Sequence, residues 1–230
     1  DKWFTGVVVT DGRGSPRNGL YEKYSDEEMR LVRFKEQRKA AIIGEFSAQV
    51  MLDHPSKSVK NGHDSSLVKD IIAILKATQP KKVFTHNLAD KHPTHIGVAV
   101  KVIRAIRSLP ELERPNHLYG CEVWRSLDWL MDEEKVVLDV SSQENLQAAL
   151  LGVFDSQISG GKRYDLATMG RRVANATYFS SHDVDSAAGL AYAMNLTPLI
   201  KNSDLDIQEY VVGHIERFAQ DVRGLITSVM

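Results

Sequence analysis

The sequence predicts an α/β protein with a Rossmann-like, mostly parallel sheet flanked by helices. Two observations predict this class. Short, apolar, β-branched segments alternate with longer segments of helical periodicity, a pattern typical of parallel sheets with helices on both faces. The chain has 230 residues, and 43% of them are hydrophobic, which is enough to bury one sizeable core. We therefore expect residues 1–230 to form a single domain.

Apolar segments that are too short for helices are predicted to be strands. They cover residues 4–10, 48–52, 83–86, 117–123 and 136–140. Helical periodicity is seen over 25–44, 65–78, 93–109, 142–154, 164–178, 186–196 and 207–229, so residues 155–230 are predicted to be mainly helical. We expect the strands 4–10 and 83–86 to lie inside the sheet, because apolar β-branched residues suit burial on both faces.

The first predicted helix has clear end signals. Ser25 and Glu28 have the spacing of a capping box, and Gly44 suits a C-terminal stop. Leu31 and Ile42 are expected among its inward-facing residues. The last helix, 207–229, carries apolar residues at helical spacing, which fits a coiled coil or, more commonly, a helix packed on the sheet.

The composition excludes several classes of protein. Lys and Arg number 29 and Asp and Glu number 30, so the charge balance gives no reason to expect a nucleic acid as partner. The one cysteine, Cys121, cannot form an internal disulfide, which favours a reducing, cytoplasmic location. No apolar run approaches the ~20 residues that span a bilayer. Assembly into a homo-oligomer is left open.

The loop that follows segment 83–86 holds the densest group of reactive side chains. Residues 85–95 read Thr-His-Asn-Leu-Ala-Asp-Lys-His-Pro-Thr-His and include three of the eight histidines. Pro93 suits the first position of a helix, which places His92 at the cap and His95 in the first turn. The helix dipole favours neutral imidazoles there, the form that binds metal. Asp90 could fix the tautomer of one ring.

Spacing alone does not decide between a metal site and a polar helix cap. A catalytic zinc site needs three protein ligands, and the other candidates, Asp53 with His54 and His63 with Asp64, belong to a predicted surface loop. The sequence lacks the GxSxG motif of serine hydrolases and the GxGxxG and GxxxxGK[ST] motifs of nucleotide sites.

Four segments agree in order and spacing with one known family. Residues 7–12 resemble that family's second strand and its TDG turn, and residues 33–44 resemble its RxxE…A…LG helix. Residues 85–95 resemble its THxxxDxHxDH segment, and residues 170–176 resemble its late GR…ANA helix. The chain therefore resembles the PIG-L (LmbE-like) family of zinc-dependent N-acetylglucosaminyl deacetylases.

This resemblance implies roles for individual residues. It assigns His95 as the third metal ligand and His92 as a catalytic group that stabilises the oxyanion, with Asp90 beside them. Arg33 and Asp11 are assigned to the wall of the substrate pocket.

Two departures from the family pattern bear on these roles. Thr94 stands between the paired histidines, where the family usually has Asp. The family's His-Pro-Asp-Asp motif, which supplies two zinc ligands and the catalytic carboxylate, matches nothing in residues 1–230. We expect that motif upstream of Asp1, within roughly 30 or more residues that would form a strand and a helix.

The resemblance implies a metal-dependent hydrolase that removes an N-acetyl group from a small amino-sugar conjugate, with Zn²⁺ or another divalent metal as cofactor. Two alternatives remain. One is a non-catalytic family member that binds sugar without hydrolysing it, and the other is an unrelated Rossmann-like binding domain.

Overall fold

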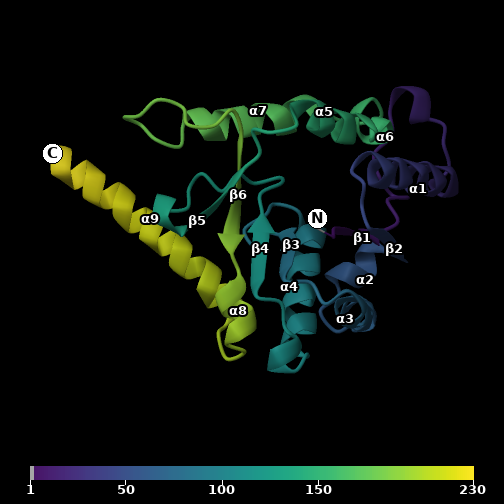
Figure 1. Ribbon diagram of the computed structural model, residues 1–230, viewed down its shortest axis with the longest axis horizontal. Coiled ribbons are helices and arrows are strands. Elements are labelled where there is room, and N and C mark those ends of the chain that lie inside the picture. Colours follow the sequence, from purple (N-terminus) through teal and green to yellow (C-terminus); the bar gives the residue numbers. More distant parts are fainter. Residues whose placement is uncertain (1–2) are drawn as a thin grey trace. The chain divides into compact units, whose positions relative to one another are not determined.

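The computed structural model describes residues 3–230 as an α/β fold with helices flanking the sheets (Figure 1). The chain divides into two compact units. The first unit comprises Asp1–Ser56 and Asp139–Leu190, and the second comprises Lys57–Leu138 and Ala191–Met230. Within residues 3–230, no helix is both long enough and apolar enough to cross a membrane.

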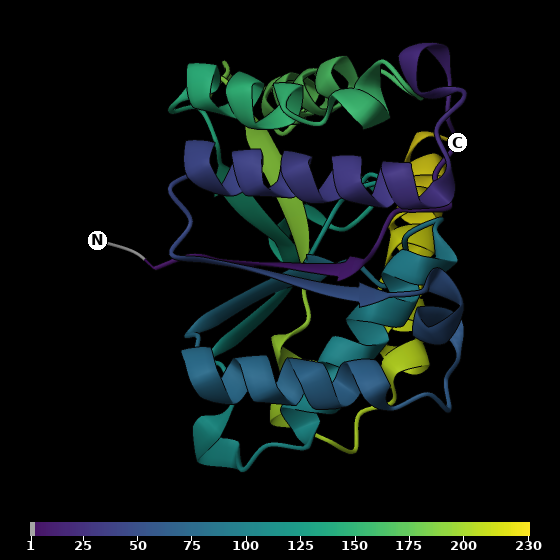
Figure 2. The same cartoon turned by 90° about the vertical axis from the view of Figure 1, so that its right-hand side faces the viewer.

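The first unit is built on a parallel pair of strands. Strand β1 (Thr5–Thr10) pairs with β2 (Ala48–His54), with Thr5 opposite Ala48. Helix α1 (Asp26–Ile43) packs on β2. The remaining helices of this unit lie on the far side of α1 (Figure 2), and they are α5 (Glu144–Gly152), α6 (Asp155–Ile158) and α7 (Tyr164–Thr177).

Helix α1 begins and ends as its sequence predicts. The Ser25 hydroxyl accepts a hydrogen bond from the Glu28 N–H, and the Glu28 carboxylate accepts one from the Ser25 N–H. At the other end, the Gly44 N–H donates to a carbonyl of the last turn. The prediction of the inner face, which also included Phe34 and Ala41, was wrong for Leu31 and Ile42, which are 49% and 77% exposed. The buried side chains are Met29, Glu36 and Ala40.

Glu36 connects α1 to the start of α6. Its carboxylate accepts hydrogen bonds from the Ser156 N–H and from the Ser156 hydroxyl, each at 2.7 Å, and both residues are buried. A buried carboxylate is costly unless its oxygens have donors. Here each oxygen has one, so the pair joins two helices that are 120 residues apart in sequence.

We predict that Glu36→Ala lowers the free energy of unfolding by about 2 kcal/mol, since a buried N–H and a buried hydroxyl lose their acceptor. Urea unfolding followed by circular dichroism measures the loss. Glu45→Ala, at an exposed position of the same unit, is the control and should change stability by less than about 0.5 kcal/mol. Equal effects of the two substitutions would contradict a stabilising role for the Glu36–Ser156 contact.

The second unit contains a mixed four-stranded sheet with the order β3-β4-β6-β5. Its strands are β3 (Lys82–His86), β4 (His117–Cys121), β6 (Leu190–Asn195) and β5 (Lys135–Asp139). Strand β3 is parallel to β4, but β6 runs antiparallel to β4. The prediction of a mostly parallel sheet is therefore corrected to a mixed one, and the predicted helix 186–196 contains strand β6 instead.

Both strands predicted to be inner ones lie at edges in the part of the chain that is described. β3 is the end strand of its sheet, and β1 belongs to a sheet of two strands. Phe84 and Val7 are accordingly 49% and 41% exposed.

The helices of the second unit surround the β3–β4 pair. Helix α4 (Pro93–Arg107) packs on β3 and on α3 (Ser66–Thr78), and α8 (Thr197–Lys201) packs on α4 and β4. The shorter α2 (Ser56–Lys60) precedes α3, and α9 (Ile207–Val229) ends the chain. The core between these elements is apolar, and its fully buried residues include Leu67, Ile103, Ile106, Leu118, Met194 and Leu199.

Candidate active site

The candidate site lies at the carboxyl ends of β3 and β4, which run side by side next to α4 (Figure 1). His86 ends β3 and is paired in register with Cys121, which ends β4. Asn87 follows His86 and is fully buried, and both its N–H and its side-chain amide donate to the Cys121 carbonyl at 3.0 Å. A Cβ atom at Gly120 would lie 2.9 Å from the Asn87 Cα, so only glycine permits this close approach.

Asp90 is the centre of this loop. Its side chain has no exposed surface, and it accepts hydrogen bonds from the His92 N–H at 3.0 Å and from the Trp124 N–H at 3.2 Å. The second carboxylate oxygen also lies 3.4 Å from Nδ1 of His95. Burial alone would raise the pKa of Asp90, but these hydrogen bonds outweigh it and hold the pKa below its usual value. Asp90 is therefore an ionised, fully buried acceptor.

The start of α4 holds the two histidines as the sequence predicts. His92 is the N-cap residue with extended backbone, Pro93 occupies the first helical turn, and the His95 N–H donates to the His92 carbonyl. His92 is exposed, whereas the His95 side chain is 21% exposed. The helix start thus presents one ring to solvent and holds the other against Asp90.

Three histidines and a tryptophan form a column of stacked rings. The His86 and His95 ring centroids are 3.9 Å apart and nearly parallel, at 6°. His92 stacks on His95 at 4.7 Å and on Trp124 at 6.3 Å. The column runs from partly buried His86 through His95 and exposed His92 to Trp124, so the His95 ring is fixed from both sides.

The environment keeps the inner rings uncharged at neutral pH. Burial lowers the pKa of His86 to about 4, and the neighbouring histidines add to this effect. Burial also lowers the pKa of His95, although Asp90 partly opposes the shift. With Asp90 accepting from the Nδ1–H of His95, the remaining nitrogen, Nε2, carries the lone pair. His95 is thus a neutral imidazole of defined tautomer, which is the state required of a metal ligand.

The His86 shift predicts an acid-sensitive fold in metal-free protein. The unfolded state binds the His86 proton with a pKa near 6.5 and the folded state with a pKa of about 4. Between these values the unfolded state holds more protons, so stability falls as the pH drops through this window. We expect a loss of about 2 kcal/mol between pH 7 and pH 4.5.

Urea unfolding in the presence of a chelator measures this loss. The variant His86→Phe keeps a stacking ring but cannot titrate, so its stability should depend less steeply on pH. His63→Phe, at an exposed histidine of the same unit, should keep the wild-type dependence. If His86→Phe unfolds with the same pH dependence as the wild type, buried His86 is not the titrating group.

The described residues supply one good metal ligand and not a complete set. Within residues 3–230, no group of three or more His, Cys, Asp or Glu side chains is arranged to hold a metal ion. A catalytic zinc needs three protein ligands and an open position. His95 fits one of these ligands, and the described residues do not complete the set of three.

Asp11 and Arg33 lie in the first unit. Asp11 is buried at the end of β1, where its carboxylate accepts hydrogen bonds from the Arg13 N–H at 3.0 Å and from the Arg13 guanidinium at 2.8 Å. The Arg13 guanidinium also lies 3.8 Å from the Asp53 carboxylate. The same carboxylate forms an ion pair with the Arg30 guanidinium. These contacts hold the turn after β1 in shape.

Arg33 is placed beside the same turn. Gly12 has a φ of +70°, and a Cβ there would lie 3.0 Å from the Arg33 Cγ, so the turn packs directly on the arginine stem. The Arg33 Nε is buried and lacks a hydrogen-bond partner among the described residues. Buried donors are rarely left unsatisfied, so this guanidinium is suited to an additional acceptor.

Two members of the ring column were not predicted as site residues. His86 lies within the predicted loop motif, but its stacking on His95 depends on the turn that returns the chain to α4. Trp124 follows a different strand and contacts Asp90 from 34 residues away. Its only sequence signal is its place just after β4, at the carboxyl edge where α/β sheets bind ligands.

One known family matches part of the chain. The family model described as GlcNAc-PI de-N-acetylase, PIG-L, matches residues 2–106. No curated protein matches the chain.

Solved structures share the fold. The 4-carboxy-2-hydroxymuconate hydratase GalB from Pseudomonas putida is 16% identical, with a TM-score of 0.62 over 84% of each chain. The N,N'-diacetylchitobiose deacetylase from Pyrococcus horikoshii is 15% identical, with a TM-score of 0.55 over 83% of this chain and 72% of that one. The A40926 pseudoaglycone deacetylase Dbv21 is 14% identical, with a TM-score of 0.55 over 84% of each chain. The resemblance to the PIG-L (LmbE-like) family is confirmed over residues 2–106, the part of the chain that the family model matches.

Proposed function

We propose that this protein is a metal-dependent amide hydrolase that removes the N-acetyl group from an amino-sugar conjugate. The observation that supports this proposal most directly is the state of His95. It is neutral, it is held through Nδ1 by a buried carboxylate, and it stands beside an exposed histidine at the start of α4. This arrangement lies in the segment that matches the deacetylase family model.

In this proposal His95 binds the metal through Nε2. Zn²⁺ suits an imidazole ligand, and other divalent ions also accept one. The bound metal would supply Lewis-acid activation of water and of the amide carbonyl. Within residues 3–230, no group of three or more His, Cys, Asp or Glu side chains completes such a site.

His92 is proposed as the catalytic group that donates to the developing oxyanion. Its ring stacks on His95 at 4.7 Å, so a substrate carbonyl at a metal held by His95 would lie near it. Asp90 has a positioning role in this scheme rather than a proton-transfer role, because its oxygens are already engaged by His95 and by two backbone N–H groups.

We propose that Arg33 and Asp11 contribute to substrate binding. Arg33 has a buried Nε without a partner in the part of the chain described, and a sugar hydroxyl would satisfy it. Asp11 already accepts two hydrogen bonds from Arg13, so we propose that it acts indirectly, by holding the turn that packs on Arg33.

The proposed function is tested by incubating the full-length protein with N-acetylglucosamine and N,N'-diacetylchitobiose and measuring free amine and acetate. We expect amine release that a chelator abolishes and Zn²⁺ restores. Sugar binding detected by calorimetry without any amine release would support the non-catalytic alternative instead. If the protein neither binds these sugars nor releases amine from them, amino sugars are excluded as its ligand class. The family match over residues 2–106 argues against the other alternative, an unrelated Rossmann-like domain.

A further inference from the structure

Helix α9 carries an uncovered apolar stripe. Its large apolar residues are exposed, from 37% for Val222 to 84% for Val229, and the full set is Ile215, Phe218, Val222, Leu225, Ile226 and Val229. With Ala219 they occupy one continuous arc of ~120° at 3.6 residues per turn. We refer to these seven residues as the α9 stripe. Singly exposed apolar residues are ordinary on a surface, but contiguous apolar patches mark interaction sites.

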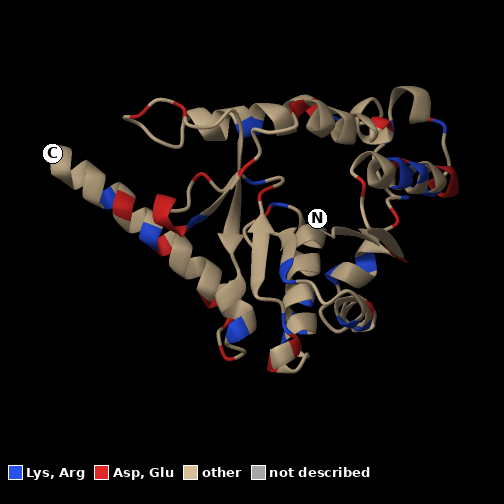
Figure 3. Cartoon of the chain, in the orientation of Figure 1, with Lys and Arg blue, Asp and Glu red and all other residues tan. Residues whose placement is uncertain are grey.

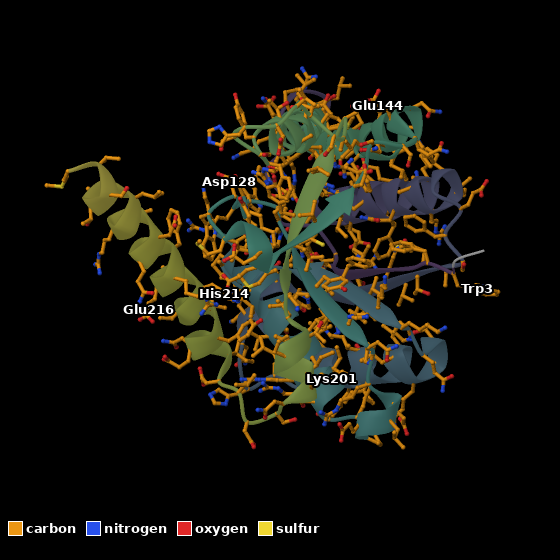
Figure 4. The ribbon with its side chains drawn as sticks, turned by 60° about the vertical axis from the view of Figure 1, so that its left-hand side comes forward. Trp3, Asp128, Glu144, Lys201, His214 and Glu216 are labelled. Carbon is orange, nitrogen blue, oxygen red and sulfur yellow. The ribbon has the colours of Figure 1, made fainter. Side chains whose placement is uncertain are left out.

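A different side of α9 holds the helix to its own unit. The Tyr210 hydroxyl donates to the Asn195 carbonyl at 2.6 Å. His214 lies 2.8 Å from the Glu134 carboxylate, and Arg217 donates to the same carboxylate at 2.5 Å. Figure 4 shows His214 on the side of α9 toward the sheet and Glu216 on the outer side. The first half of α9 is therefore anchored while the stripe stays uncovered.

The spacing of the stripe favours another helix as its occupant. Residues 215, 218, 222, 225 and 229 follow alternating steps of three and four, which is the pattern of a coiled-coil seam. A membrane surface fits less well, because the charged residues of α9 are balanced in sign, with Glu209, Glu216 and Asp221 against Arg217 and Arg223. The last turns of α9, after Arg223, carry no charged side chain (Figure 3).

We propose that the α9 stripe binds the same stripe of a second copy of this chain, with the two helices antiparallel and crossing near Ala219. In this register Phe218 faces the partner's Val222, and Ile215 faces the partner's Leu225. Each pair sets two apolar side chains at facing seam positions. Both pairs are centred on position 220, so the small Ala219 lies next to the two-fold axis, where the helices approach most closely.

The charges on one flank of the stripe are self-complementary in the antiparallel arrangement. Glu216 and Arg223 lie on the same flank, seven residues apart, and neither side chain forms an ion pair with another residue of the described range 3–230. When two helices run antiparallel, each flank meets its own counterpart in reverse order. Glu216 then meets the partner's Arg223, and Arg223 meets the partner's Glu216. In a parallel pair this flank would meet the opposite one, where Arg217 is already paired with Glu134 of its own chain.

Analytical ultracentrifugation of the purified full-length protein tests the proposal. We expect a concentration-dependent dimer between about 1 and 100 µM. Leu225→Glu should raise the dissociation constant at least ~100-fold, because it places a charge in each half of the apolar seam. Thr227→Glu, on the polar side of the same turn, is the matched control and should change the constant by less than ~3-fold.

The register is tested by reversing charges. Glu216→Arg and Arg223→Glu should each weaken the dimer by ~3–10-fold, and the double variant should restore it, since both intermolecular pairs are re-formed. A protein that stays monomeric at the highest concentration overturns the proposal. So does a dimer that Leu225→Glu leaves intact. A double variant as weak as the single ones overturns the antiparallel register. Circular dichroism of each variant confirms that these exposed substitutions leave the fold in place.

Discussion

Replacement of His95 by alanine is expected to abolish both metal binding and amide hydrolysis in the full-length protein. The His95 ring is the neutral imidazole of the loop whose Nδ1 is held by a buried carboxylate. Removing it takes away a metal ligand, and a zinc site that loses one of three protein ligands loses most of its affinity. Metal content of the purified variant and its rate of amine release measure the two losses.

His92→Ala is expected to separate these two properties. The His92 N–H donates to Asp90, and its exposed ring stacks between His95 and Trp124. If the ring donates to the oxyanion, its loss should reduce kcat by ~10²–10³-fold while most of the metal stays bound. His63→Ala, at an exposed histidine of the same unit, is the control and should retain both metal and rate.

The opposite pattern would reverse the assignment. If His92→Ala strips the metal and His95→Ala leaves it bound, His92 is the ligand. If neither substitution changes metal content or turnover, the two histidines are helix-capping residues, and the proposed function falls with them.

The helical parts of the fold were predictable because their signals are local. Ser25 and Glu28 form the capping box that their spacing indicates, and Pro93 opens α4 with His92 as its cap. Such motifs satisfy free N–H groups within one turn, so they act independently of the rest of the chain.

Strand β6 was not predictable from local signals. Residues 190–195 read Leu-Ala-Tyr-Ala-Met-Asn, a short apolar run that suits a buried helix as well as a strand. The choice is made by tertiary contacts, because β6 pairs antiparallel with β4 and the Tyr192 N–H donates to the Glu122 carboxylate. Alanine, leucine and methionine favour helices in isolation, and here sheet pairing overrides that preference.

The candidate site likewise combines residues that local signals reveal with residues that only tertiary contacts bring together. Asp90, His92 and His95 all lie within residues 90–95, so their spacing at a helix start is enough to indicate that they lie close together. The contribution of Trp124 depends on β4 lying beside β3, which no local pattern reveals. Likewise, the close approach of Asn87 to Gly120 joins two distant parts of the chain and depends on the pairing of these strands.

The shared fold does not fix the chemistry. The solved structures that resemble this chain include a hydratase and two deacetylases, all at 14–16% identity. A hydratase adds water across a double bond, whereas a deacetylase cleaves an amide, so the scaffold serves both. Any distinction must come from the residues at the sheet edge, which makes the His95 environment the feature to test.

Two substitutions of Asp90 should separate its contribution to stability from its contribution to metal binding. Asp90→Ala removes a fully buried acceptor from two backbone N–H groups and from the His95 ring. Each buried donor left without a partner costs ~1–3 kcal/mol, so we expect a loss of about 3 kcal/mol in the free energy of unfolding. The lowered pKa of Asp90 means that this stabilisation is present at neutral pH and is lost only as the pH falls below the usual carboxyl range.

Asp90→Asn should behave differently, because it preserves the shape of the side chain and one acceptor oxygen. The fold should lose much less stability than with alanine, but the side-chain amide cannot hold the Nδ1–H tautomer of His95 as the carboxylate does. Loss of such an outer-shell partner typically weakens metal binding by ~10–100-fold. Asp64→Asn is the matched control, since Asp64 also accepts a backbone N–H at a helix start, from Ser66, without touching a histidine. An Asp90→Asn protein that binds metal as tightly as the wild type would show that His95 needs no orienting carboxylate, and the positioning role of Asp90 would then be wrong.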